Sequence, residues 1–331
     1  MPADRWSTSM ALKGLERFKP NLDPPRDFHA FWDSTVADLA LTGPEVVLGP
    51  PEPTASGAEL RRVRFRSLGG ARISAYLLRS RSGRPCPIIV HAHGYNDRYE
   101  VRGDWARDCH VLGFDVRGFG RSGDGLRLSA DGYVLTGIES PETSILRGAV
   151  SDYLQAARVA RDILQGDATT MTFKGFSFGG ALSLMAAALS TEPNLVVLGQ
   201  PTFGWHAERR RVSLAGSTHE VNRYLERYPW RLDTVAGTLE YFESAHFAPL
   251  VTAPTFVGIG LDDDVVPSRT VLAIVNYLRC PTEIRFLPVS HSNDSREELW
   301  KKFHSEWLEY VVDGIPSDFG LEPRQIRSLV A

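Results

Sequence analysis

The sequence predicts an α/β fold in which a mostly parallel central sheet is covered by helices on both faces. Short, nearly continuous apolar segments alternate with longer amphipathic segments over most of the 331 residues, a pattern typical of buried parallel strands joined by helices. The expected strands span residues 88–92, 111–116, 170–174, 195–198, 255–259 and 284–287. The expected helices span residues 144–164, 179–189, 268–278 and 295–312. In the first of these helices, apolar residues recur at intervals of three and four, which places them on one face.

Two segments lie outside this alternation. Residues 1–58 are rich in proline and contain one amphipathic stretch at 27–41, so we expect an N-terminal arm that wraps the core. After the arm, two alternating segments flank Gly69-Gly70, which predicts a β-hairpin. Residues 201–246 are rich in aromatic side chains and are expected to form a cap insertion over the carboxyl ends of the strands, where ligands bind in such folds. An oligomer contact or helical padding is an equal alternative for this insertion, and the whole chain is interpreted as one domain.

Composition argues against several classes of function. The formal net charge is -3, which offers no basic field for nucleic acid or for an anionic membrane. The one basic run, residues 209–211, is expected to be a solvated helix face. Cys86, Cys109 and Cys280 form neither a disulfide framework nor a metal-ligand spacing. The N-terminus lacks the pattern of a signal peptide and no segment is apolar over the length of a membrane span, so a cytoplasmic protein is expected.

The pentapeptide Gly175-Phe176-Ser177-Phe178-Gly179 lies between an expected strand and an expected helix. A serine in this setting is held on a sharp turn with its hydroxyl exposed, and the small residues around it let strand and helix approach closely. We therefore predict that Ser177 is a catalytic nucleophile on an α/β-hydrolase fold.

A serine nucleophile needs a base, and the base needs an acid that orients it. In this fold the acid follows the serine along the chain, and Asp263 is the expected acid because it lies in the loop after the strand at 255–259. Asp262 and Asp264 are alternatives for the same role. A further, weaker interpretation is that the three aspartates together bind a metal cation.

The base is expected last in the chain order. His291 follows the final predicted strand and precedes the C-terminal helix, which is the position that the base requires. The histidines that follow no core strand are weaker candidates: His206, His219, His246 and His304.

Two backbone N–H groups are expected to stabilise the oxyanion of the reaction. One is that of Phe178, directly after the nucleophile and at the positive end of its helix. The other is that of Tyr95, in the loop after the strand at 88–92, and the Tyr95 ring is expected to wall the acyl pocket. Arg117, after the next strand, is interpreted as a structural residue paired with an acid.

These motifs resemble carbohydrate esterase family 7, which comprises acetyl xylan esterases and cephalosporin C deacetylases. The resemblance runs through nearly the whole chain and includes HGYND, DVRGFGRSG, GFSFGG, GLDDDVVPSRT and the long segment 132–164. It places the family's triad on Ser177, Asp263 and His291, and its oxyanion donors on the N–H groups of Tyr95 and Phe178. It also implies a substrate of small acetylated sugars, no metal or organic cofactor, and a cytoplasmic homo-oligomer, a hexamer with active sites facing an internal chamber.

Three positions depart from the family's usual pattern. Phe119 and Phe178 occupy positions where the family has glutamine, and Ser292 stands where it has glutamate after the histidine. The N–H group of residue 178 is present with any side chain, so the oxyanion prediction is unaffected. Two phenylalanines are expected to make the substrate-binding surroundings, which we assign to Tyr95, Phe119 and Phe178, less polar.

The function predicted from the sequence is therefore a serine esterase that removes acetyl groups from small acetylated carbohydrates or related esters through an acyl-enzyme. A general short-chain carboxylesterase, or an acylated-peptide hydrolase of the same fold, is the alternative within this chemistry. A non-catalytic binding protein of the same fold is a weaker alternative, because all three candidate triad residues are present.

Overall fold

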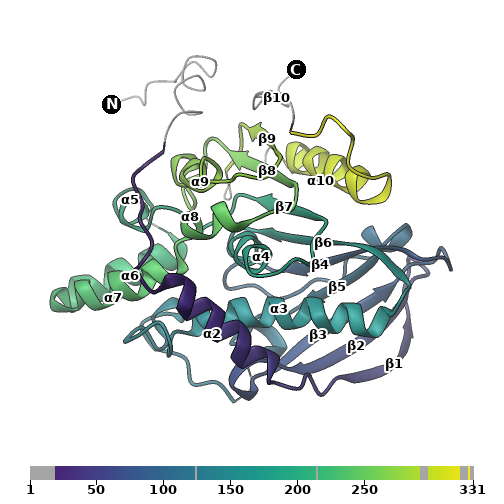
Figure 1. Cartoon of the computed structure of the whole chain (residues 1–331), viewed down its shortest axis with the longest axis horizontal. Coiled ribbons are helices and arrows are strands. Elements are labelled where there is room, and N and C mark those ends of the chain that lie inside the picture. The colour runs from purple at the N-terminus through teal and green to yellow at the C-terminus, as the bar shows by residue number, and fades with distance from the viewer. Residues whose placement is uncertain (1–18, 124, 214, 291–296, 321–326, 329–331) are drawn as a thin grey trace.

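The structure is a computed structural model that describes residues 19–123, 125–213, 215–290, 297–320 and 327–328 (Figure 1). Within these residues the strands form a single ten-stranded sheet in the order β1-β2-β3-β5-β4-β6-β7-β8-β9-β10. Their bounds are β1 Val47–Pro53, β2 Glu59–Arg66, β3 Arg72–Arg79, β4 Cys86–Ala92, β5 His110–Phe114, β6 Ala168–Phe176, β7 Leu195–Gly199, β8 Thr255–Gly260, β9 Thr282–Leu287 and β10 Arg327–Ser328. The six strands expected from the sequence are all present as β4 to β9.

The sheet is parallel from β5 through β4 to β10 and antiparallel at the N-terminal side, where β1, β2, β3 and β5 pair in turn. The predicted hairpin is confirmed: β2 and β3 pair antiparallel across the Gly69-Gly70 turn. The arm also supplies the edge strand β1, which the sequence analysis did not anticipate because Pro50 and Pro51 lie inside it. Proline is tolerated at a sheet edge, and the pairing shifts register between Leu48 and Pro51.

Helices cover both faces of the sheet, as predicted. Alternate residues of β4 show the two sides: Ile88 and Val90 belong to one buried cluster and Ile89 to the other. The first cluster includes α2 Phe28–Ala40, α3 Ile145–Leu164, α4 Phe178–Ala188 and α9 Ser268–Val275, and the second includes α10 Glu297–Val312. No helix among the described residues has the length and apolarity needed to cross a membrane.

The segment between β7 and β8 is helical, with α5 His206–Val212, α6 Gly216–Arg227, α7 Leu232–Leu239 and α8 Ser244–Phe247. Figure 1 shows α6 and α7 at one end of the molecule, next to the arm helix α2. The arm and the insertion are in contact, because the Trp32 indole N–H donates to the Tyr241 carbonyl at 3.1 Å.

Arg117 has the structural role expected of it. Its Nε and Nη2 atoms donate to the two carboxylate oxygens of Asp152 on α3 at 2.9 and 2.7 Å, and both side chains are buried. A Cβ atom at Gly148, one turn earlier on α3, would lie within 2.5 Å of three atoms of the guanidinium group, so glycine leaves the space for this pair. A bidentate buried pair of this kind joins the loop after β5 to α3.

Candidate active site

Ser177 lies at the turn between β6 and α4, and its backbone is in an unusual conformation. Its φ is 54° and its ψ is -113°, a region that costs a non-glycine residue conformational energy and that is concentrated at functional sites. Hydrogen bonds hold it there, because Ser177 N donates to Gly199 O on β7 at 2.8 Å and Ala181 N donates to Ser177 O at 3.0 Å. The residue is 9% exposed and its side chain makes no helix-capping hydrogen bond.

The glycines on either side of Ser177 are required by close packing. A Cβ atom at Gly175 would lie 2.1 Å from the carbonyl carbon and oxygen of Gly179, and one at Gly179 would lie 2.3 Å from Ala92 O. These distances are far below van der Waals contact, so any larger residue would push the strand, the turn and the helix apart. The contact between Gly179 and Ala92 also brings the first turn of α4 against the end of β4.

The two expected oxyanion donors lie at this junction. Phe178 is the first residue of α4, where backbone N–H groups have no acceptor within the helix. Tyr95 is three residues beyond β4, in a loop that is held by His93, whose Nδ1 lies 2.6 Å from Gly94 O and whose Nε2 accepts from Val116 N at 3.0 Å. The rings of Tyr95 and Phe178 are in edge contact, 5.6 Å between centroids.

Five rings surround this junction and are called here the aromatic group: Tyr95, Phe119, Tyr133, Phe178 and Phe203. The Phe119 and Phe178 rings lie 6.0 Å apart, and both side chains are buried. Phe203 follows β7 and contacts Phe178 at 5.8 Å. The structure therefore brings together the rings of Tyr95, Phe119 and Phe178.

Asp263 lies in the loop after β8 and is buried, whereas Asp262 and Asp264 are exposed. Its Oδ1 atom accepts hydrogen bonds from Val265 N at 3.0 Å and from Val266 N at 2.7 Å. These bonds hold one carboxylate oxygen in place. The burial and the fixed orientation of Asp263 distinguish it from the two other aspartates that the sequence left as alternatives.

His291 lies outside the described residues, together with Ser292. The chain on its N-terminal side is tied to the Asp263 loop: Asp262 N donates to Val289 O at 3.2 Å and Ser290 Oγ donates to Asp264 Oδ1 at 3.0 Å. Because β6, β7, β8 and β9 are parallel neighbours, their carboxyl ends bring the loops of Ser177, Asp263 and Ser290 to one edge of the sheet.

The model of the acetyl xylan esterase family, AXE1, matches residues 7–310 of this chain. The chain belongs to the acetyl xylan esterase family. The acetyl esterase Axe7A of Xylanibacter ruminicola is 21% identical over 307 residues, covering 87% of this chain and 69% of that protein. The family assignment identifies the chain as a hydrolase that acts on ester bonds, with acetyl esterase activity.

Solved structures of similar fold include two acetyl xylan esterases. That from Paenibacillus sp. R4 superposes with a TM-score of 0.82 at 24% identity, covering 91% of this chain and 99% of the other. That from Thermoanaerobacterium sp. superposes with a TM-score of 0.79 at 23% identity, covering 89% and 98%. The α/β-hydrolase fold predicted from the sequence is confirmed.

Two residues that contact these loops were missed by the sequence analysis. Gln200 directly follows β7, with its φ at 44°, and its buried amide bridges to the Asp263 loop. Its Oε1 accepts from Gly260 N at 2.5 Å and its Nε2 donates to Val266 O at 2.6 Å. A polar residue at the carboxyl end of a core strand is the signal that could have identified it.

Glu220 is the second missed residue, and it connects the insertion to the loop after β4 that carries Tyr95. The Tyr95 hydroxyl donates to Glu220 Oε2 at 2.5 Å, and Glu220 lies on α6, 125 positions along the chain. Burial raises the pKa of Glu220, and burial together with the Glu220 hydrogen bond raises the pKa of Tyr95. No local sequence pattern marks a contact between residues this far apart.

Of the weaker histidine candidates, His206 contacts Phe203 of the aromatic group at 5.7 Å between ring centroids. Burial lowers the pKa of His206 to about 3 and that of His304 to about 3, and His304 Nδ1 accepts from the Trp307 indole at 3.0 Å. His246 Nδ1 lies 2.9 Å from Glu240 O. Among the described residues no group of three histidine, cysteine or acidic side chains is arranged to hold a metal ion.

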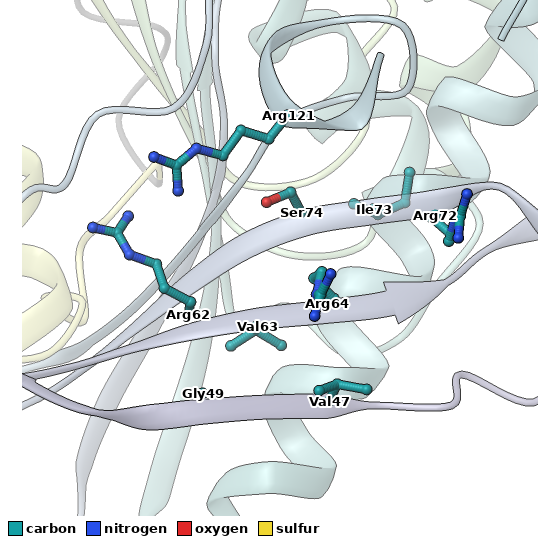
Figure 2. A pocket seen from close by; sticks show the side chains of 9 residues that line it. All are labelled: Val47, Gly49, Arg62, Val63, Arg64, Arg72, Ile73, Ser74 and Arg121. Carbon is teal, nitrogen blue, oxygen red and sulfur yellow. The ribbon is translucent and has the colours of Figure 1, made fainter. Parts of the chain in front are cut away.

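A groove lies on the N-terminal part of the sheet, apart from the predicted site residues. It has a volume of about 540 Å³ and is lined by residues of β1, β2 and β3 together with Arg121. Figure 2 shows the side chains of Arg62, Arg64, Arg72 and Arg121 around it. None of the residues assigned to catalysis lines this groove.

Proposed function

We propose that the protein is a serine acetyl esterase whose triad is Ser177, Asp263 and His291, and whose oxyanion donors are the N–H groups of Tyr95 and Phe178. The observation that carries the proposal is the conformation of Ser177, a strained residue at a strand-to-helix turn. Such a turn presents a hydroxyl beside the free N–H groups of a helix N-terminus, which suits acyl transfer.

In this mechanism His291 takes the hydroxyl proton of Ser177 as the serine oxygen attacks the acetyl carbonyl. The two backbone N–H groups stabilise the negative oxygen of the tetrahedral intermediate, and His291 returns the proton to the leaving alcohol. Water then attacks the acetyl-serine with the same base, which releases acetate. Asp263, with one oxygen held by the N–H groups of Val265 and Val266, orients the imidazole ring through its other oxygen.

The proposed substrates are small acetylated carbohydrates or related acetyl esters, bound against Tyr95, Phe119 and Phe178. The relatives support this proposal, since each of them is named an acetyl xylan esterase or an acetyl esterase. The aromatic group supports a short acyl chain, because four of its five rings are buried and pack with apolar surface close to the oxyanion donors.

The same apolar surroundings favour a second candidate, a general short-chain carboxylesterase. Phe119 and Phe178 offer no hydrogen bond to a sugar hydroxyl. A series of 4-nitrophenyl esters from acetate to hexanoate separates the two candidates. A kcat/KM that falls steeply beyond acetate supports the acetyl esterase, and a maximum at butyrate supports the general carboxylesterase.

The direct test is release of acetate from 4-nitrophenyl acetate and from acetylated xylose by the wild type and by Ser177→Ala. The proposal requires that Ser177→Ala abolish both activities while its melting temperature stays near that of the wild type. Ser190→Ala, at a partly exposed serine just after α4, is the matched control and should keep full activity. Wild-type turnover by Ser177→Ala would overturn the assignment.

The wider organisation of the enzyme is part of the same proposal. The 331 residues form one α/β-hydrolase domain, in which residues 1–58 are an arm and residues 201–246 cap the catalytic residues. Support comes from β1 of the arm, which joins the central sheet, and from the Tyr95 contact to α6. We also propose a cytoplasmic homo-oligomer, a hexamer by resemblance to the family, which needs no bound cofactor. Sedimentation velocity measures the subunit count.

A further inference from the structure

The basic run at residues 209–211 is not the uniformly solvated helix face that its sequence predicts. Arg211 is exposed and pairs with Glu208 at 2.8 Å, as expected for a surface residue. Arg209, two positions earlier on α5, is only 4% exposed. That part of the prediction is wrong, because α5 turns this one side chain inward between the insertion and the core.

Arg209 has no acidic partner at ion-pair distance in the part of the chain that the structure describes. Its Nη2 donates a long hydrogen bond, 3.4 Å, to Ser217 Oγ, and its buried Nε has no hydrogen-bond acceptor there. The hydroxyl of Thr218, next to Ser217, is also buried without a partner among the described residues. Burial lowers the pKa of Arg209 to about 10, so the group still carries its charge at neutral pH.

Glu243 is the acidic residue whose charge acts on Arg209, and its carboxylate already accepts other hydrogen bonds. The Glu243 carboxylate accepts N–H bonds from Trp205 at 2.8 Å, His206 at 2.9 Å and Ala245 at 3.2 Å, and its charge acts on Arg209 only from beyond ion-pair distance. A buried cation without a direct counter-charge is costly. Such a group is therefore expected to meet its partner in a bound molecule.

The position of Arg209 identifies where that molecule would lie. Its guanidinium carbon is 5.4 Å from the centroid of the Phe203 ring. Phe203 contacts Phe178, the residue that carries one oxyanion N–H group. Tyr95, which carries the other, contacts Phe178 at 5.6 Å between ring centroids. The cation thus lies beside the aromatic group that surrounds the proposed oxyanion donors.

We propose that Arg209 binds a carboxylate on the alcohol part of the substrate, so that the preferred substrates are acetyl esters of hydroxy acids or uronic acids. This inference rests on the function proposed above. The carboxylate takes no part in bond making: the ester and water give acetate and the free hydroxy acid, and Arg209 only holds the product half in place. Guanidinium groups suit this task because their planar N–H groups match a carboxylate.

The wild-type enzyme provides the first test. Acetate release is measured from an O-acetylated glucuronic acid and from the corresponding O-acetylated glucuronamide, which has the same shape without the charge. A direct charge-assisted hydrogen bond predicts a kcat/KM at least about tenfold higher for the acid. Equal values for the two substrates, or a preference for the amide, would overturn the proposal.

Variants then locate the preference. Arg209→Gln should bring the acid-to-amide ratio close to one, Arg209→Lys should restore part of it, and Arg211→Gln, the matched control, should keep the wild-type ratio. Melting temperature separates binding from a structural role. If Arg209 serves ligand binding and not stability, the Arg209→Gln variant should melt at or above the wild-type temperature, because the substitution removes a buried unpaired charge. A lower melting temperature with an unchanged ratio would contradict the proposal.

Failure of this inference is distinguishable from failure of the proposed function. If the wild type hydrolyses 4-nitrophenyl acetate through Ser177 but does not distinguish acid from amide, only the role of Arg209 is refuted. If 4-nitrophenyl acetate is not hydrolysed, or is hydrolysed equally by Ser177→Ala, the proposed function is refuted, and the Arg209 inference is refuted with it.

Discussion

The hydrogen bond between Tyr95 and Glu220 makes a specific prediction about catalysis. Tyr95 is the residue whose N–H group is proposed to contact the oxyanion, and its hydroxyl is held by Glu220 at 2.5 Å from a helix of the insertion. Replacing Glu220 by glutamine keeps the shape and removes the charge, so a neutral amide oxygen replaces the charged acceptor of the Tyr95 hydroxyl. The loop that carries the Tyr95 N–H group is then held less tightly at the far end of the side chain.

The size of the effect follows from the contact. Hydrogen bonds to charged groups contribute about 1.5–3 kcal/mol and those between neutral groups about 0.5–1.5 kcal/mol, so the exchange at the partly buried Glu220 costs about 1 kcal/mol. Because about 1.4 kcal/mol corresponds to a factor of ten in rate, Glu220→Gln is expected to lower kcat about fivefold. KM for 4-nitrophenyl acetate should change less than twofold, since the oxyanion exists only in the transition state.

The assay is steady-state hydrolysis of 4-nitrophenyl acetate by Glu220→Gln, Tyr95→Phe and the double variant. Tyr95→Phe removes this contact and Glu220→Gln weakens it, so the double variant should be no slower than Tyr95→Phe alone. Glu226→Gln, at an exposed position on the same helix, is the control and should behave as the wild type. A wild-type kcat for Glu220→Gln, or losses that add in the double variant, would refute the coupling between α6 and the oxyanion loop.

Three further predictions concern stability and are checked by chemical denaturation. Gly179→Ala should lower the free energy of unfolding by about 2–4 kcal/mol and reduce activity, because the added Cβ would lie 2.3 Å from Ala92 O. Unchanged stability would show that the turn can relax. Asp152→Asn should cost about 3–5 kcal/mol because it leaves the buried Arg117 charge without its partner, and a loss below 1 kcal/mol would contradict this. Burial raises the pKa of Glu243 from 4.5 to about 7, so the folded state holds this proton more tightly than the unfolded state does. Its contribution to stability, about 3 kcal/mol, is therefore present below pH 4.5 and lost as pH rises through 7; Glu243→Gln should flatten that part of the stability profile, and an unchanged slope would show that another group titrates.

Much of the fold could be predicted because local patterns and tertiary structure agree. The strands β4 to β9 are nearly continuous apolar runs, and burial on both faces requires that composition. The edge strand β1 was missed because prolines usually exclude a strand, whereas an edge needs hydrogen bonds on one side only. The predicted helix at 268–278 is shorter in the structure and ends at Val275.

The proposed catalytic residues followed from position along the chain, since Ser177 and Asp263 each lie just after a core strand. Contacts between distant segments have no such signal. Glu220 and Arg209 were missed as site residues because the sequence shows that they lie on helices but not which side chain turns toward the core. The roles of Phe119 and Phe178 were partly anticipated, because any phenylalanine there makes the site less polar.

The central claim is that Ser177 is the nucleophile, and covalent labelling tests it most directly. The enzyme is treated with a fluorophosphonate probe, digested and analysed by mass spectrometry, with acetate release measured in parallel. We predict one adduct on Ser177, loss of activity in proportion to labelling, and neither adduct nor activity for Ser177→Ala. An adduct on another serine, or full activity after complete labelling of Ser177, would contradict the account.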